Sequence, residues 1–175
     1  MKKHLFFALF AFAALAFSAC NKNKPDPVYV DLGLPSGTLW KSENESTQVG
    51  RDKGIYTFDE AVETFGDQLP TIAQWRELVS ECEWKHEIGY TVVGPNGNSI
   101  TLTTYPATRY CNGNIDNGSS HRARYWSSTE AQRYSEEEER KALYLYVDWD
   151  SNQDKIILMT DPGEVCGAIL VRLVK

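Results

Sequence analysis

Aromatic, amide and arginine side chains gather near a loop rich in glycine and asparagine, which runs from residue 112 to residue 120. Such side chains build sites for polar ligands, because aromatic faces stack on ligand rings while amides and guanidinium groups form hydrogen bonds. A long solvated loop has the same composition, so an unliganded surface loop is the alternative. The candidate ligand-binding residues here are Tyr105, Arg109, Tyr110, Asn112 and Asn114.

Oxygen-bearing side chains alternate from Asp148 to Asp154, as they do in calcium-binding loops. The EF-hand spacing would require glycine at Gln153 and glutamate at Met159, and neither is present. Aspartate and asparagine are also common in hairpin turns, so we interpret this segment as a turn. We predict no metal site and no cofactor.

Nucleophilic chemistry has few candidates. Cys111 or Cys166 paired with His121 would resemble a thiol activated by a base. In an oxidising compartment, one disulfide and one remaining thiol explain the same cysteines more simply. Cys82 is the third cysteine after residue 20, and three pairings stay open. We predict no catalytic residues and a protein that is not an enzyme.

The first residues predict export and lipid attachment. Lys2 and Lys3 precede an apolar run from residue 5 to residue 17, too short for a permanent membrane-spanning helix of about 20 residues. The run ends in Phe17, two small residues and Cys20, which resembles the motif cut by the bacterial lipoprotein signal peptidase. An ordinary signal peptide cut nearby is the alternative. We therefore predict a signal peptide over 1–19, lipidation of Cys20 and a polar tether over 20–27.

Composition limits the remaining residues to one domain over 28–175. The whole chain has a net charge of −6, and −8 without Lys2 and Lys3. Such a charge argues against nucleic acid as a partner, because phosphate binding requires a basic surface.

Hydrophobic patterns predict an α+β fold. A first hairpin covers 28–40, and two amphipathic helices begin after the N-caps Thr57 and Thr71. Phe58, Ala61, Val62 and Phe65 should form the buried stripe of the first helix. Strands predominate after the second helix, with hairpins predicted around 94–99 and 148–155 and a closing strand over 168–174.

Four ordered motifs resemble the Fibrobacter succinogenes major paralogous domain, a family common in lipoproteins of gut Bacteroidetes. They are Val30-Asp-Leu-Gly-Leu-Pro-Ser-Gly-Thr-Leu-Trp40, Leu69-Pro-Thr-Ile-Ala-Gln-Trp75, Gly94-Pro-Asn-Gly-Asn-Ser-Ile100 and Tyr125-Trp-Ser-Ser-Thr129, followed by Val171-Arg172 near the end. The chain departs from the family pattern after Trp40, where Lys-Ser-Glu-Asn replaces small apolar residues and cysteine. A binding role for residues 41–53 is therefore not expected.

The family is similar to C-type-lectin-like folds, which implies two helices packed beside a twisted antiparallel sheet, adjacent domain ends and long recognition loops. Because Trp126 lies in a family motif, the resemblance favours core packing for that ring. Tyr125 points to the opposite strand face and joins the candidate ligand-binding residues. We expect a lipoprotein of the outer membrane, on either face, that binds a carbohydrate or an envelope protein. The alternatives are an accessory subunit of a surface assembly without a small ligand, and a degenerate enzyme.

Overall fold

The computed structural model describes residues 28–45, 54–87, 89–104, 108–116 and 121–175. The predicted signal peptide, Cys20 and the tether lie outside the described residues, as does Tyr105. Among the described residues, no helix has the length and apolar character needed to cross a membrane.

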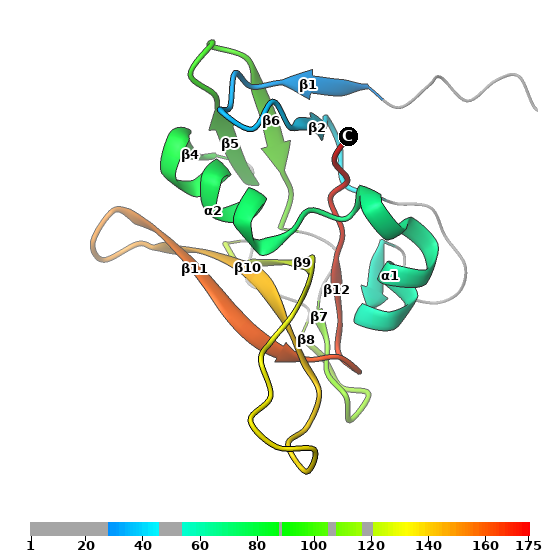
Figure 1. The fold of residues 1–175 in the computed structure, drawn as a ribbon. Coiled ribbons are helices and arrows are strands. Elements are labelled where there is room, and N and C mark those ends of the chain that lie inside the picture. Colours follow the sequence, from blue (N-terminus) through cyan, green and yellow to red (C-terminus); the bar gives the residue numbers. More distant parts are fainter. Residues whose placement is uncertain (1–27, 46–53, 88, 105–107, 117–120) are drawn as a thin grey trace, which may run out of the picture.

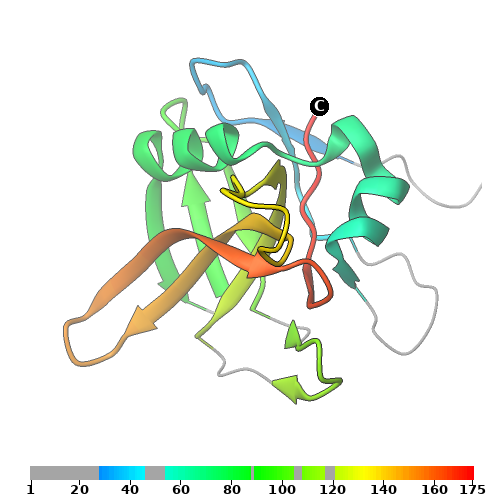
Figure 2. The same ribbon diagram turned by 60° about the horizontal axis from the view of Figure 1, so that its bottom comes forward.

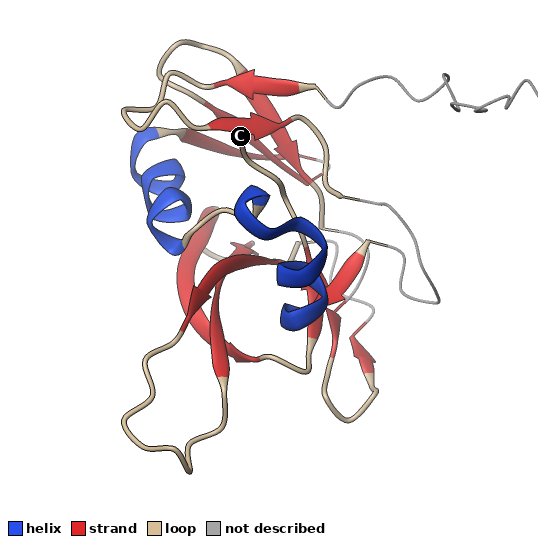
Figure 3. Cartoon of the chain, turned by 45° about the vertical axis from the view of Figure 1, so that its right-hand side comes forward, coloured by secondary structure: helices blue, strands red, loops and turns tan. Residues whose placement is uncertain are grey.

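The described residues form an α+β domain, as the sequence predicts (Figures 1, 2 and 3). The helices are α1 (Phe58–Phe65), the short 3-10 helix η1 (Gly66–Gln68) and α2 (Ile72–Glu81). The first six strands are β1 (Tyr29–Asp31), β2 (Leu39–Lys41), β3 (Ile55–Thr57), β4 (Glu83–Glu87), β5 (Gly89–Val93) and β6 (Ser99–Leu102). The later strands are β7 (Thr108–Arg109), β8 (Ile115–Asp116), β9 (Ala123–Glu130), β10 (Lys141–Asp150), β11 (Lys155–Glu164) and β12 (Ala168–Leu170).

Both helices begin at the predicted N-caps. The side chain of Thr57 accepts a hydrogen bond from the Glu60 backbone, and the Glu60 carboxylate accepts one from the Thr57 backbone. Thr71 and Gln74 repeat this capping box at the start of α2. The predicted stripe of α1 is wrong at one position: Val62 is 40% exposed. Only a narrow face of this two-turn helix reaches the core.

The strands form three sheets. The largest has the order β11-β10-β9-β12-β7-β8, with β3 also paired to β12. Its pairs are antiparallel except β9 and β12, which run parallel. The sheet is therefore mixed, whereas the family resemblance implies an antiparallel sheet. A second sheet contains β4-β5-β6, and β1 pairs with β2. Helix α2 lies between the three-stranded sheet and strands β9–β11 (Figure 1).

Two hydrophobic clusters cover opposite faces of β9. The larger is built around Trp40, Trp75 and Tyr125, and the smaller contains Phe58 and Trp126. Trp40 and Trp75 pack with their ring centroids 4.7 Å apart, and the Phe58 and Trp126 rings meet edge to face at 5.6 Å. Both faces of the large sheet are therefore packed at β9, and this packing limits where a ligand can reach the strand.

The last residues of the domain lie against the β1–β2 hairpin. The backbone N–H of Leu39 donates to the carbonyl of Lys175 over 3.0 Å, and the N–H of Lys175 donates back over 2.9 Å. Trp40 also forms a bridge with Val174. The residues after β12 thus attach the β1–β2 hairpin to the rest of the domain (Figure 1).

Candidate functional site

A cleft of about 380 Å³ lies on the face of the large sheet that carries Trp126. Strands β7, β9, β10, β11 and β12 contribute to it, together with the β7–β8 and β11–β12 turns. Its lining residues are Thr108, Arg109, Tyr110, Cys111, Arg124, Trp126, Lys141, Tyr144, Pro162, Gly163, Glu164, Gly167 and Ile169. Its volume is in the range of pockets that hold small ligands, about 300–1,000 Å³.

Aromatic rings form the inner part of the cleft. Trp126 on β9 pairs in register with Tyr144 on β10, and the two rings meet edge to face with centroids 6.0 Å apart. The indole N–H of Trp126 donates to the carbonyl of Tyr56 over 2.8 Å, which fixes the ring. Gly163 on β11 leaves room for Tyr144, because a Cβ there would lie 2.7 Å from Cε1 of that ring. The position of the Tyr144 ring in the cleft wall therefore depends on glycine at position 163.

Three cationic side chains and one carboxylate line the same cleft: Arg109, Arg124, Lys141 and Glu164. The guanidinium of Arg124 is positioned by two contacts, because Nη1 donates to the Thr108 hydroxyl over 3.2 Å and the group lies 5.5 Å from the Tyr146 ring centroid. This local excess of positive charge contrasts with the net charge of −6 for the chain. The cleft therefore favours ligands that carry negative charge or many hydrogen-bond acceptors.

The phenol of Tyr144 stays protonated at neutral pH. Burial raises its pKa above the usual value, although the nearby guanidinium of Arg124 acts in the opposite direction. A protonated phenol both donates and accepts hydrogen bonds. Tyr144 thus adds a neutral polar group beside the cations.

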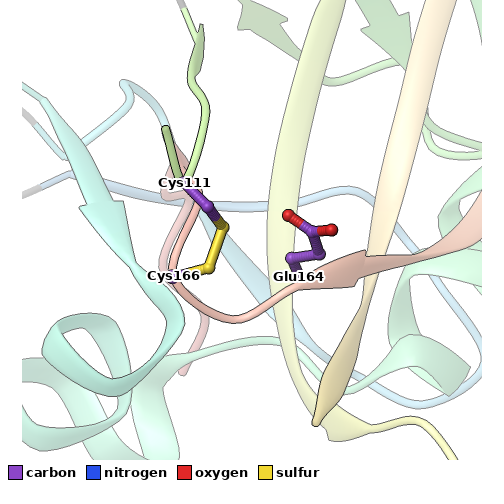
Figure 4. Close-up of side chains that lie close together, drawn as sticks. All are labelled: Cys111, Glu164 and Cys166. Atoms are coloured by element: carbon purple, nitrogen blue, oxygen red, sulfur yellow. A yellow bond between two sulfur atoms is a disulfide. The ribbon is translucent and has the colours of Figure 1, made fainter. Parts of the chain in front are cut away.

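A disulfide between Cys111 and Cys166 closes one edge of the cleft, with Cα atoms 5.1 Å apart. It joins the β7–β8 turn to the turn after β11 (Figure 4). Among the described residues Cys82 is the free thiol. The pairing that the sequence left open is therefore Cys111 with Cys166.

The disulfide also bears on two other hypotheses for these residues. Both sulfurs lie within 4.8 Å of the Glu164 carboxylate, but a disulfide sulfur has no thiolate with which to hold a metal ion. Neither sulfur is a free thiol that His121 could activate as a nucleophile. Nδ1 of His121 instead lies 3.4 Å from Nε2 of His86. The cysteine–histidine pairs considered from the sequence are not formed.

The structure divides the sequence-predicted ligand residues. Arg109 and Tyr110 line the cleft. Asn112 and Asn114 lie in the β7–β8 turn outside it, where the Asn112 side chain accepts a hydrogen bond from the Asn114 backbone over 2.9 Å. Tyr105 lies outside the described residues.

Tyr125 is not a ligand-binding residue at the surface, because its side chain is fully buried. Its hydroxyl donates to the carbonyl of Thr103 and accepts from Nδ2 of Asn44 over 3.0 Å. Trp126 is also buried, as expected, yet it reaches the cleft. The prediction for Tyr125 fails because the face of β9 to which its ring points is covered by the larger hydrophobic cluster.

The cleft residues that the sequence did not single out include Arg124, Lys141, Tyr144 and Glu164. One signal was present, because Arg124 and Trp126 are two positions apart and therefore share a strand face. The register of β9 with β10 and β11, which brings the other residues alongside, is a long-range property.

The segment from Asp148 to Asp154 lies in a hairpin, but its first three residues end β10 and the turn itself covers 151–154. The Asp150 carboxylate accepts hydrogen bonds from the backbone of Asn152 over 2.9 Å and of Gln153 over 3.3 Å. Asp148 accepts from the Tyr146 hydroxyl over 2.7 Å. Both carboxylates therefore accept hydrogen bonds from within the hairpin.

Together these features define an α+β domain with a cleft of aromatic and cationic side chains on one face of its largest sheet. Comparison with protein-family models, with curated proteins and with solved structures found no match in any of the three.

Proposed function

We propose that this chain is an envelope lipoprotein whose C-type-lectin-like domain binds a carbohydrate in the cleft without catalysis. The observation that carries the proposal is the lining of the cleft, which combines aromatic rings with cationic side chains. Such a lining suits a carbohydrate, because aromatic groups stack on the apolar faces of sugar rings and polar or charged side chains form directed hydrogen bonds with sugar hydroxyls. The motifs shared with the paralogous-domain family support the lectin-like interpretation of the fold.

The charges in the cleft point to an acidic carbohydrate. Arg109, Arg124 and Lys141 outnumber Glu164, so a carboxylate or sulfate on the sugar gains charge-assisted hydrogen bonds. Tyr110 is 43% exposed at the rim and offers a ring face to the ligand.

The signal-like start and Cys20 support membrane attachment. Cleavage before Cys20 and acylation of its thiol would hold the domain on the outer membrane by a tether of a few polar residues. Mass spectrometry of the native protein tests this: an acylated N-terminal Cys20 is expected, and an unmodified first residue in freely soluble protein contradicts it.

A glycan array probed with the full chain in detergent tests the ligand. We expect binding to acidic glycans, and a loss of at least about tenfold in affinity for Arg109→Ala and for Lys141→Ala. Asn114→Ala is the matched control, because Asn114 lies in the adjacent turn outside the cleft. An empty array together with a co-purifying envelope protein would favour the accessory-subunit alternative.

A further inference from the structure

Two histidines from distant parts of the chain lie side by side on the surface, away from the cleft. His86 is in β4, and His121 comes just before β9. Nδ1 of His121 lies 3.4 Å from Nε2 of His86, and the ring centroids are 5.2 Å apart. Neither residue lines the cleft or takes part in the proposed carbohydrate binding.

The surroundings hold both histidines in place. The His86 ring stacks on Trp149 of β10, with centroids 4.8 Å apart and 13° between the planes. The Tyr90 ring lies 5.3 Å from the His86 ring, and its hydroxyl donates to the carbonyl of His121. Tyr90 therefore contacts one histidine through its ring and the other through its hydroxyl.

We propose that His86 and His121 form a binding site for one divalent late transition-metal ion, of the zinc, copper and nickel class. Imidazole nitrogens bind zinc at about 2.0–2.1 Å with tetrahedral angles, so two of them on one ion lie about 3.3 Å apart. The ring centre lies beyond the nitrogen on the line from the metal ion. With the same tetrahedral angle, the centroids of two such rings lie about 5.2 Å apart. The nitrogens and rings of this pair already have that spacing.

The site is accessible and its charges are compatible with a cation. His121 is exposed and His86 is partly exposed, so water can complete the coordination. The cationic side chains next to the two histidines in sequence pair with carboxylates. Arg122 contacts Asp148 at 3.4 Å and Asp116 at 4.0 Å, and Lys85 contacts Glu83 at 3.4 Å. Binding requires both rings to be neutral, with their protons on Nε2 of His121 and Nδ1 of His86, so that the facing nitrogens present lone pairs.

Titration of the full chain, carrying a tag other than polyhistidine, with Zn²⁺ and Cu²⁺ tests the site. We expect one ion per chain, and quenching of tryptophan fluorescence by Cu²⁺ because Trp149 stacks on a ligand ring. His86→Gln and His121→Gln should each weaken binding at least about tenfold, since even residues that only support metal ligands cost about 10–100-fold. Trp149→Phe should keep the binding and lose part of the quenching.

Two variants separate this site from other ligands on the chain. His4→Gln removes the third histidine, and Cys82→Ser removes the free thiol among the described residues; neither should change the affinity. Near-ultraviolet circular dichroism of His121→Gln checks the fold, which should persist because His121 is exposed. Equal metal affinity in the wild type and in folded His121→Gln, or no binding by the wild type, overturns the proposal.

Discussion

Tyr125 and Trp126 are adjacent in β9, but their rings belong to different hydrophobic clusters on opposite faces of the sheet. Both side chains are almost completely buried, and each directs its polar atom to a backbone carbonyl: the Tyr125 hydroxyl to Thr103 and the Trp126 indole to Tyr56. The two residues therefore connect β9 to separate parts of the domain. Only Trp126 also reaches the cleft.

Tyr125→Phe should lower the free energy of unfolding by about 0.5–1.5 kcal/mol, because it removes the hydrogen bonds of the buried hydroxyl to the Thr103 carbonyl and from the Asn44 amide. Urea denaturation measures the change. Tyr134→Phe is the control, since Tyr134 is 83% exposed and should have no effect. If Tyr125→Phe unfolds at the wild-type midpoint but loses ligand binding, Tyr125 has a binding role after all.

Removing the disulfide with Cys111→Ser and Cys166→Ser should destabilise the protein by about 2–5 kcal/mol, because the bond closes a loop with a separation of 55 residues. The β7–β8 hairpin has only two residues in each strand, and its connection to β12 is a single register pair, Ala168 with Arg109. Glycan affinity should therefore fall as well. Cys82→Ser controls for loss of a thiol, and an unchanged denaturation midpoint in the double variant would contradict the prediction.

Gly163→Ala should destabilise the protein by about 1–3 kcal/mol, because the new methyl group would lie 2.7 Å from the Tyr144 ring. Replacing Tyr144 with leucine in the same chain should recover part of that loss, which a double-mutant cycle measures as a coupling energy. If the two changes in the free energy of unfolding were additive, the coupling energy would be zero and the Tyr144 ring would not clash with the new methyl group.

Cys82 should react slowly with alkylating reagents in the folded protein. Burial, followed by the negative charges of Glu81 and Glu77, raises the pKa of its thiol from 9.0 to about 11. The thiolate is the reactive form, so alkylation at pH 8 should be about 100-fold slower than for an unperturbed thiol and should rise with pH toward 11. Peptide mass spectrometry after timed iodoacetamide treatment measures the rate, and urea-unfolded protein provides the reference. Equal rates in folded and unfolded protein would contradict it.

The helices were predictable from sequence because their signals are local. Thr57 with Glu60 and Thr71 with Gln74 form capping boxes within four residues. The short strand β4 gave no such signal, since its sequence Glu-Trp-Lys-His-Glu is mostly charged. Trp84 and His86 are only partly buried, and the register of β4 with β5 is set by the assembled fold.

The candidate site was predictable only where its residues carry a local sequence signal. Arg109 and Tyr110 were found from their residue types near a loop, and they do line the cleft. Tyr125 was misassigned because strand alternation indicates two faces but not whether both are covered. The contributions of Tyr144 and Lys141 depend on strand register, which no local pattern specifies.

Strand β12 comes late in the chain, yet it lies inside the large sheet between β9 and β7 and also pairs with β3. The backbone of Val174 donates to Gln68 over 2.8 Å, and Lys175 exchanges hydrogen bonds with Leu39. Residues 168–175 therefore supply pairing partners to the β1–β2 hairpin and to β3, β7 and β9. Folding should be slow and all-or-none, so a ribosome-bound chain would stay unfolded until this segment emerges.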